Sequence, residues 1–191
     1  MLIYKKVAYY GSIQLMDIDF SYLHEAQKMT DITYYLEISP RFMNGPALSI
    51  KKIHPKSGIF KACDVYKEFS KYAGFIDLDK VYVINTVGHL WLLKSLCIHF
   101  LLLIRWVTGR YNVIHLAWPL NLYQLILYIL KKKMILTVHD PFPHSFQDTK
   151  IVRLRRKIAF SLIFHFIIPN QKQKDKFINY NNLRNKHVID S

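Results

Sequence analysis

Short apolar runs alternate with longer segments of helical spacing along the whole chain. The runs typical of strands are rich in β-branched or aromatic residues: Lys6–Tyr10, Ile32–Ile38, Lys80–Ile84, Asn112–Leu116, Met134–Val138 and His165–Ile168. The segments typical of helices are Phe20–Lys28, Asp64–Tyr72, Leu90–Val107, Asp148–Phe164 and Gln171–Tyr180. This alternation predicts an α/β fold: one Rossmann-like, doubly wound domain over residues 1–191, with a mainly parallel sheet flanked by helices.

Turn and capping residues set the expected boundaries. Gly11–Ser12 is expected to close the first strand, and Asp17 or Asp19 to cap the helix that follows. Lys52–Gly58 is rich in turn residues. Asp148 is expected to open the basic helix near the carboxyl terminus.

The stretch Tyr111–Ser145 carries the clearest arrangement. It contains a strand, a helix-length apolar segment and a second strand, which predict a βαβ unit with parallel strands and a right-handed crossover. Ligands of open parallel sheets lie at the carboxyl ends of the strands. The ionisable side chains near those ends are His115, His139, Asp140 and His144, so this edge is where we expect the chemistry.

The apolar segment Leu90–Val107 raises the question of a membrane span, which needs about 20 apolar residues. Lys94, His99 and Arg105 lie within it, and charges near a bilayer centre are costly. At helical spacing these residues and Ser95 fall on one arc. A helix packed on the sheet with one wet edge, or lying against a membrane surface, is therefore predicted over a spanning helix.

Composition excludes several protein classes. With 191 residues, 51% hydrophobic and 15% aromatic, the chain can bury a core and is not a disordered tail. Cys63 and Cys97 lie in unrelated segments, which indicates a reducing compartment and neither a disulfide framework nor a zinc site. The amino terminus shows no signal-peptide pattern, so a cytoplasmic protein is the default expectation.

The formal net charge of +14 points to an anionic partner. No Asp or Glu lies between Lys80 and His139, and the segment from Lys150 to Ser191 is strongly basic. Such a surface is expected to be attracted to anionic lipid on the inner face of the cell membrane. A soluble basic protein is the alternative; nucleic-acid binding is not predicted, because no known nucleic-acid motif accompanies the charge.

Two strand ends carry a resemblance to a known family. Val113–Pro119 reads V-I-H-L-A-W-P, and Ile135–His144 reads I-L-T-V-H-D-P-F-P-H. With the helix and Lys-rich turn between them, they resemble the amino-terminal domain of GT-B-type glycosyltransferases, in the group called subfamily 4-like. The match is strong over Lys80–Asn170 and weaker before it. It implies half of a two-domain enzyme whose other half holds most of the nucleotide sugar.

The resemblance implies catalytic roles for His139 and Asp140. His139, at the T-x-H position, would face the cleft where acceptor and donor sugar meet, as a general base or a hydrogen-bond donor. The alternative is a histidine that caps backbone groups in a tight turn. Asp140 would orient His139 or bind a sugar hydroxyl; it could equally form an Asx turn.

Further site residues are expected around this pair. His115, Trp118 and His144 are the expected acceptor- or substrate-binding residues, with core packing as the alternative for Trp118. Gly11 and Ser12 lie where the family often has a glycine-rich loop near the donor phosphates, although no GxGxxG motif is present. No metal and no other cofactor is expected, since a His/Asp/His metal site on the loop after Val138 lacks further ligand spacing.

Two Asp-x-Asp triplets, Asp17–Asp19 and Asp77–Asp79, resemble a metal motif of a different glycosyltransferase fold. Both precede expected helix or strand starts, so capping or turn roles are predicted instead.

The resemblance implies a glycosyltransferase, or its amino-terminal fragment, that transfers a sugar from a nucleotide-sugar donor to a lipid-linked or polysaccharide acceptor. The donor half of such enzymes typically shows a Glu-x7-Glu motif, and Glu25, Glu37 and Glu68 lack that spacing. The chain is therefore expected to be the acceptor-side half, with a donor domain or partner subunit elsewhere. A non-catalytic module that binds glycan, lipid or a partner, and an inactive truncated product, are the alternatives.

Overall fold

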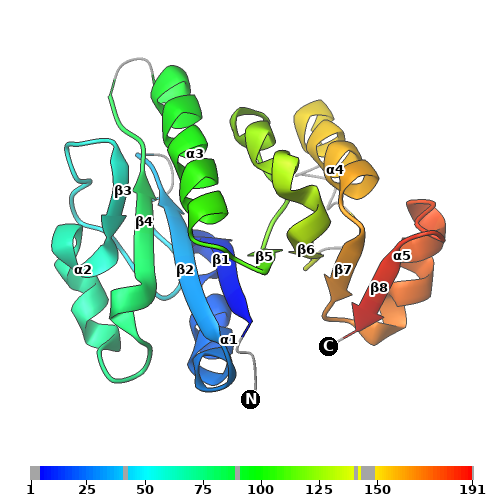
Figure 1. Cartoon of the computed structure of the whole chain (residues 1–191), viewed down its shortest axis with the longest axis horizontal. Helices are drawn as coiled ribbons and strands as arrows, with labels where there is room; N and C mark the ends of the chain where they lie inside the picture. The colour runs from blue at the N-terminus through cyan, green and yellow to red at the C-terminus, as the bar shows by residue number, and fades with distance from the viewer. Residues whose placement is uncertain (1–4, 41–42, 89–90, 140–141, 143–148, 191) are drawn as a thin grey trace.

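The computed structural model describes residues 5–40, 43–88, 91–139, 142 and 149–190. Their strands are β1 (Lys6–Ser12), β2 (Asp31–Ile38), β3 (Gly58–Lys61), β4 (Val81–Asn85), β5 (Val113–Leu116), β6 (Met134–Thr137), β7 (His165–Ile168) and β8 (His187–Asp190). They form one sheet in the order β3-β4-β2-β1-β5-β6-β7-β8 (Figure 1), in which every neighbouring pair is parallel except β3 and β4. The predicted Rossmann-like, doubly wound α/β fold is confirmed.

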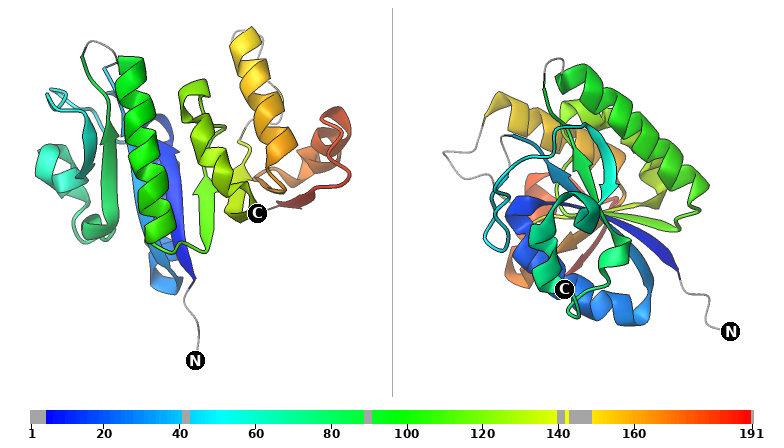
Figure 2. Two further views of the ribbon diagram at one scale, coloured as in Figure 1. Left: turned by 45° about the horizontal axis from the view of Figure 1, so that its top comes forward. Right: turned by 90° about the vertical axis from the view of Figure 1, so that its left-hand side faces the viewer.

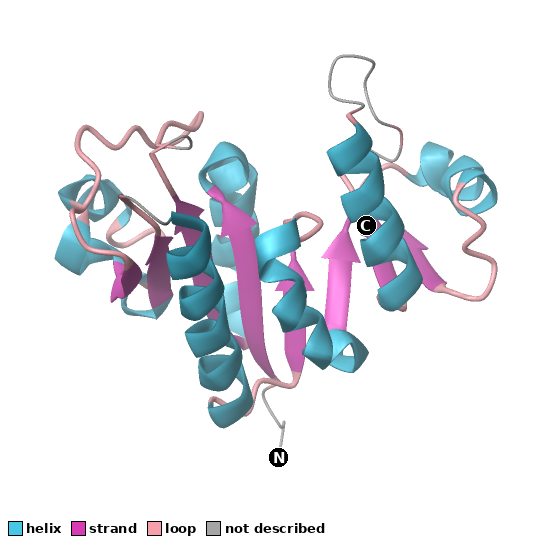
Figure 3. Ribbon diagram, turned by 90° about the horizontal axis from the view of Figure 1, so that it is seen from above, coloured by secondary structure: helices cyan, strands magenta, loops and turns pink. Residues whose placement is uncertain are grey.

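Helices cover both faces of the sheet. The α-helices are α1 (Met16–Met29), α2 (Ala62–Val65), α3 (Trp91–Thr108), α4 (Lys150–Leu162) and α5 (Lys174–Tyr180). The 3-10 helices are η1 (Ile13–Leu15), η2 (Lys67–Tyr72), η3 (Leu78–Lys80), η4 (Leu122–Lys133) and η5 (Gln171–Gln173). The right-hand view of Figure 2 shows α3 and α1 on opposite sides of the sheet. Seen from above in Figure 3, α3, η4 and α4 stand in a row along one side.

The alternation of side chains along each strand builds two cores. On β1, Tyr10 packs with Trp106 in the core beneath α3, η4 and α4, whereas Tyr9 packs with Phe20 in the core beneath α1. The carboxyl ends of β1, β2, β4, β5 and β6 then lie along one edge. Since β1 has β2 on one side and β5 on the other, the topological switch point falls between β1 and β5 on this edge.

Several boundaries differ from the predicted ones because long-range pairing overrides local turn signals. Gly11–Ser12 does not close the first strand; it extends β1 by pairing with β2. Gly58 begins β3 instead of ending a turn. The helix predicted over Asp64–Tyr72 is divided into the short α2 and the 3-10 helix η2. The apolar segment after β5 forms η4, with non-helical torsion angles at Leu130.

Helix capping also differs from expectation. The residue before α1 is Leu15, which makes no side-chain cap, so neither Asp17 nor Asp19 has the predicted capping role. Asp148 lies outside the described residues. The hydroxyl of Thr149 caps α4 by accepting a hydrogen bond from the Val152 amide.

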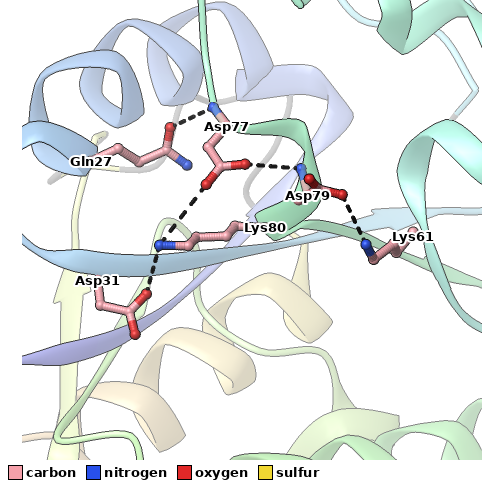
Figure 4. Close-up of polar contacts among 6 residues, drawn as sticks. All are labelled: Gln27, Asp31, Lys61, Asp77, Asp79 and Lys80. Atoms are coloured by element: carbon pink, nitrogen blue, oxygen red, sulfur yellow. Dashed lines mark hydrogen bonds and ion pairs between the residues drawn. The ribbon is translucent and has the colours of Figure 1, made fainter.

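The second Asp-x-Asp triplet has the predicted turn role, at the edge opposite the carboxyl ends of the strands (Figure 4). Asp77 caps η3 by accepting from the Asp79 amide at 3.1 Å. Asp79 pairs with Lys61 at 2.8 Å, and Lys80 pairs with Asp31 at 2.9 Å. The Lys80–Asp31 pair joins the starts of β4 and β2, and the Lys61–Asp79 pair joins the end of β3 to η3. Exposed pairs of this kind contribute little stability each.

Helix α3 buries a mixed polar and apolar side against the sheet and leaves a second, apolar side exposed. The prediction that one edge of this helix faces solvent is wrong for Ser95 and His99, which are buried. Lys94 is exposed, as predicted. The inward side also carries Leu102 and Trp106. The outward side chains are 43% to 57% exposed and comprise Trp91, Leu92, Leu93, Leu96, Phe100, Leu101, Ile104 and Val107.

Among the described residues, α3 alone is long and apolar enough to cross a membrane by length and composition. Its mean hydropathy is 1.5, and 33% of it is buried in the protein. A helix packed on a sheet passes the same test, so this property alone does not indicate a span.

Candidate functional site

The first hollow on the carboxyl edge lies where β5 and β6 end. Trp118 follows β5 and His139 follows β6, and both are partly buried. The hollow measures about 20 Å³, room for about one water molecule. Its wall consists of Trp118, Pro119, Thr137, Val138, His139, Val152, Arg155 and Arg156. The structure thus brings together two of the predicted site residues, His139 and Trp118; Asp140 and His144 lie outside the described residues.

His115 lies behind this hollow and is shielded from solvent. Its Nε2 atom is hydrogen-bonded to Thr137 Oγ1 at 2.7 Å, and its ring packs edge-on against Tyr9 with centroids 4.6 Å apart. Burial, and then the nearby charge of His139, lower the pKa of His115 to about 4. His115 is therefore neutral at pH 7 and reaches the hollow through Thr137. Its predicted contact with an acceptor stays a prediction.

Gly11 and Ser12 have local structural roles at the end of β1. A Cβ atom on Gly11 would lie 2.3 Å from Asp19 Oδ2 and 2.6 Å from the Tyr34 hydroxyl oxygen, so only glycine leaves room for this pair. The Ser12 hydroxyl accepts a hydrogen bond from the Gln14 amide at the start of η1. The packing against Asp19 accounts for Gly11 without a ligand, and the donor-phosphate role of both residues stays a prediction.

Asp19 is a buried carboxyl group that the sequence assigned to a helix cap. The hydroxyls of Tyr9 and Tyr34 each donate to it at 2.7 Å. Burial raises the pKa of Asp19 to about 7, although both hydroxyl donors oppose that rise. The group therefore titrates near neutral pH, beneath the end of β1.

A second and larger hollow lies between the ends of β2 and β4 and the first turns of α3 and η4. It measures about 340 Å³, within the range of ligand pockets. Its wall consists of Glu37, Ser39, Pro40, Thr86, Val87, Gly88, Trp91, Ser95, Asn121 and Tyr123. We call it the Glu37 pocket. None of its residues was predicted to belong to a site.

The Glu37 carboxylate is held by neutral groups from two elements. Tyr123 donates to Oε1 at 2.9 Å, and Gln124 Nε2 donates to Oε2 at 2.8 Å. The Tyr10 hydroxyl lies 3.3 Å from the same Oε2 atom. Strand β1 and helix η4 thus position a carboxylate that belongs to β2, in one fixed orientation.

A buried histidine supports this arrangement from behind. The backbone carbonyl of Ser95 lies 2.7 Å from His99 Nδ1, which fits an Nδ1–H donor and leaves Nε2 as an acceptor. The Tyr10 hydroxyl lies 3.1 Å from that Nε2 atom, and Gln124 Nε2 donates to the Tyr10 oxygen at 2.7 Å. Burial lowers the pKa of His99, which favours its neutral form.

Arg155 of α4 holds the loop that follows β5. It lines the His139 hollow, and its guanidinium donates to the backbone carbonyls of Leu120 at 3.2 Å and Pro119 at 2.6 Å. Its charge also acts on Glu37. This side chain therefore holds the loop after β5 against the His139 hollow, and its charge is felt at Glu37.

Sequence reasoning missed the Glu37 pocket because its members come from separate segments. One signal was present: Glu37 is a single carboxylate near the end of the apolar run Ile32–Ile38. Thr86 directly follows β4 in the same way. Polar residues at strand ends other than those of β5 and β6 could have been flagged by the same rule.

Comparison with known proteins identifies the fold. No protein-family model matches the chain, and no curated protein sequence does. Solved structures match at low identity. UDP-N-acetylglucosamine 2-epimerase from Rickettsia bellii matches with a TM-score of 0.56 and 9% identity, over 98% of this chain and 44% of its own. Sucrose-phosphate synthase from Thermosynechococcus elongatus matches with a TM-score of 0.56 and 10% identity, over 97% of this chain and 47% of its own.

A glycosyltransferase from Rickettsia africae ESF-5 matches with a TM-score of 0.52 and 9% identity, over 98% of this chain and 42% of its own. The chain thus spans less than half the length of each of these proteins. It has the Rossmann-like fold of one half of a GT-B-type glycosyltransferase, which the two strand-end motifs predicted.

Proposed function

We propose that this chain is the acceptor-side half of a glycosyltransferase that moves a sugar from a nucleotide-sugar donor to a lipid-linked or polysaccharide acceptor. The placing of His139 beside Trp118, at the carboxyl edge of this fold, carries the proposal. Two of the similar structures also support it by name: one is a glycosyltransferase, and the other is an epimerase of the nucleotide sugar UDP-N-acetylglucosamine. A second domain or a partner subunit would supply the donor-binding half.

In this proposal His139 acts on the acceptor hydroxyl or on the leaving phosphate, and Asp140 supports it. Trp118, His115 and His144 form the acceptor side of the site. The small size of the His139 hollow means that its walls must move apart, or a donor half must complete it, before a sugar fits. Gly11 and Ser12, at the end of β1, lie on the same edge as a donor phosphate would.

A transfer assay tests the proposal. The native protein is isolated from its own cells, its intact mass is measured, and it is incubated with radiolabelled nucleotide sugars and a lipid or polysaccharide extract. We expect label in the acceptor fraction. A mass near 22.7 kDa would call for the partner subunit in the assay. Binding of glycan without transfer by the complete assembly would favour the non-catalytic alternative and contradict the proposal.

We further propose that the protein works in the cytoplasm, on the inner face of the cell membrane. The outward apolar side of α3 supports this, as does Ile129 of η4, which is 68% exposed. Helix η4 packs beside α3 and ends in the exposed Lys131–Lys133. Apolar side chains bordered by lysines fit a bilayer with anionic headgroups, where each basic residue contributes on the order of 1 kcal/mol.

Replacing Leu93, Phe100 and Ile104 of α3 by glutamine, all three at once, is expected to lower binding to phosphatidylglycerol vesicles by about tenfold or more. The reason is that three apolar side chains that would be buried in the bilayer are lost. Vesicle co-sedimentation measures the effect. The matched control replaces Ile18 and Met29, exposed apolar residues of α1, and should bind like the original protein. Equal binding by both variants would contradict a docking role for α3.

A further inference from the structure

We propose that the Glu37 pocket binds a neutral sugar ring of the acceptor, other than the ring that receives the transferred sugar, through Thr86 Oγ1 and the Glu37 carboxylate. This inference rests on the proposed function and deepens it, since it adds a second acceptor-binding pocket to the His139 hollow. Three observations on the walls of the pocket, together with its charge, lead to this ligand class.

The first observation is a buried hydroxyl that lacks a partner. Thr86 is 5% exposed and lines the pocket, and its Oγ1 atom has no hydrogen-bond partner among the described residues. Buried polar groups of folded proteins are hydrogen-bonded in the great majority of cases. Oγ1 has less than 1 Å² of exposed surface, so the Thr86 side chain must turn toward the pocket before a ligand hydroxyl can bond to Oγ1 and satisfy it.

The second observation is the orientation of Glu37 toward the same space. Its Oε2 atom is engaged by Gln124 and approached by Tyr10, whereas among the described residues Oε1 accepts from Tyr123 alone. A carboxylate oxygen has two lone pairs, so Oε1 can accept one more hydrogen bond. Because β2 and β4 are neighbours and both residues line the pocket, Glu37 and Thr86 can contact adjacent hydroxyls of one ring.

The third observation is the aromatic mouth of the pocket. Trp91 is 46% exposed and stands nearly perpendicular to Tyr123, at 87° and with ring centroids 5.8 Å apart. The two rings offer apolar contact to the faces of a sugar, while Ser95 and Asn121 add polar groups. Large apolar surfaces with a few placed polar groups are the usual composition of a small-molecule site.

Charge selects a neutral ligand over an ionic one. Glu37 is the carboxylate in the described wall of the pocket, and its negative charge disfavours a phosphate or carboxylate beside it. The Lys94 ammonium lies at the rim, where it donates to the Val87 carbonyl at 3.4 Å, and it disfavours a cation. The charge of Arg155, which acts on Glu37 from α4, disfavours a cation there. A hydroxyl-rich neutral ring is repelled neither by the negative charge of Glu37 nor by the positive charges near it.

Binding of simple glycosides to the full chain tests the proposal without any nucleotide sugar. The probes are the methyl glycosides of glucose, mannose and N-acetylglucosamine, with inorganic phosphate and choline as ionic comparisons. The NMR signal of the Trp91 indole N–H, assigned with Trp91→Phe, reports binding at this pocket. We expect at least one methyl glycoside to shift that signal at millimolar concentration, and neither ion to do so.

The deciding variant is Thr86→Val, which keeps the shape of the side chain and removes Oγ1. Since no protein partner loses a bond, its folding stability should be unchanged or higher, while glycoside affinity should fall by about 3- to 10-fold. Thr108→Val, at the far end of α3, is the matched control and should bind normally. A second variant, Glu37→Gln, should also weaken binding.

Three results would overturn the proposal. In the first, no glycoside shifts the indole N–H signal of Trp91. In the second, Thr86→Val binds the glycoside as tightly as the original protein does, and in the third only phosphate or choline binds. None of them bears on sugar transfer, which the assay with nucleotide sugars decides separately. Conversely, glycoside binding by a protein that transfers no sugar would support the binding pocket and contradict the proposed transferase activity.

Discussion

Replacing His139 with alanine is expected to lower the turnover of sugar transfer by about 10²- to 10⁴-fold, the usual contribution of a positioned acid or base. The side chain stands at the end of β6, where the fold places its ligands, and no other described histidine lines that hollow. Steady-state kinetics of the complete, active assembly measure the effect. Thermal unfolding of the variant checks that the fold is retained.

The matched control is His187→Ala, because His187 is exposed on the edge strand β8, away from the carboxyl ends of β5 and β6. Its turnover should match that of the original protein. Unchanged turnover in His139→Ala would remove His139 from the catalytic site and leave a turn-capping role for it.

Asp19 is expected to make the stability of the protein fall as the pH rises from about 4 to about 7. The folded state raises the pKa of this carboxyl group from 3.8 to about 7, so the folded protein binds this proton more tightly than the unfolded chain does. Its stabilising contribution is complete below pH 3.8 and is lost as the pH rises through about 7. A shift of this size corresponds to about 4 kcal/mol in the free energy of unfolding.

Urea unfolding of the original protein and Asp19→Asn, at pH 4 and pH 8, measures this contribution. Between pH 4 and pH 8, the unfolding free energy of Asp19→Asn relative to that of the original protein should rise by about 4 kcal/mol. His115, whose pKa is lowered to about 4, changes stability in the opposite direction but is present in both proteins. The exposed Asp17→Asn is the control, and a pH dependence as large in Asp17→Asn would contradict the assignment to Asp19.

The strands and the main helices could be predicted because their signals are local. The runs that became β2, β5 and β7 are apolar, short and bounded by turn residues, and the segment that became α3 was found within one residue at each end. Elements whose form depends on a distant partner were missed or misjudged. Strand β3 exists because it pairs with β4, and Gly11–Ser12 is extended because it pairs with β2.

The candidate site divides in the same way. His139 and Trp118 could be placed together from the sequence, because a βαβ unit brings the ends of its own two strands side by side. Glu37 and Thr86 lie far apart in the sequence, and nothing local indicates that Tyr123 and Gln124 of η4 would reach Glu37. The same holds for the buried Asp19, which by sequence looked like a helix cap.

The sequence by itself determined the fold class, the edge where we expect the chemistry and the positions of His139 and Trp118 on that edge, because strand order within a βαβ unit follows from hydrophobic spacing and chirality. Only the tertiary structure decided which side of each element is buried. Apolar residues lie around most of α3, so periodicity cannot tell which side of this helix meets the sheet. Here His99 is buried with hydrogen-bond partners in Ser95 and Tyr10, beside Leu102 and Trp106, and a second apolar side is left exposed.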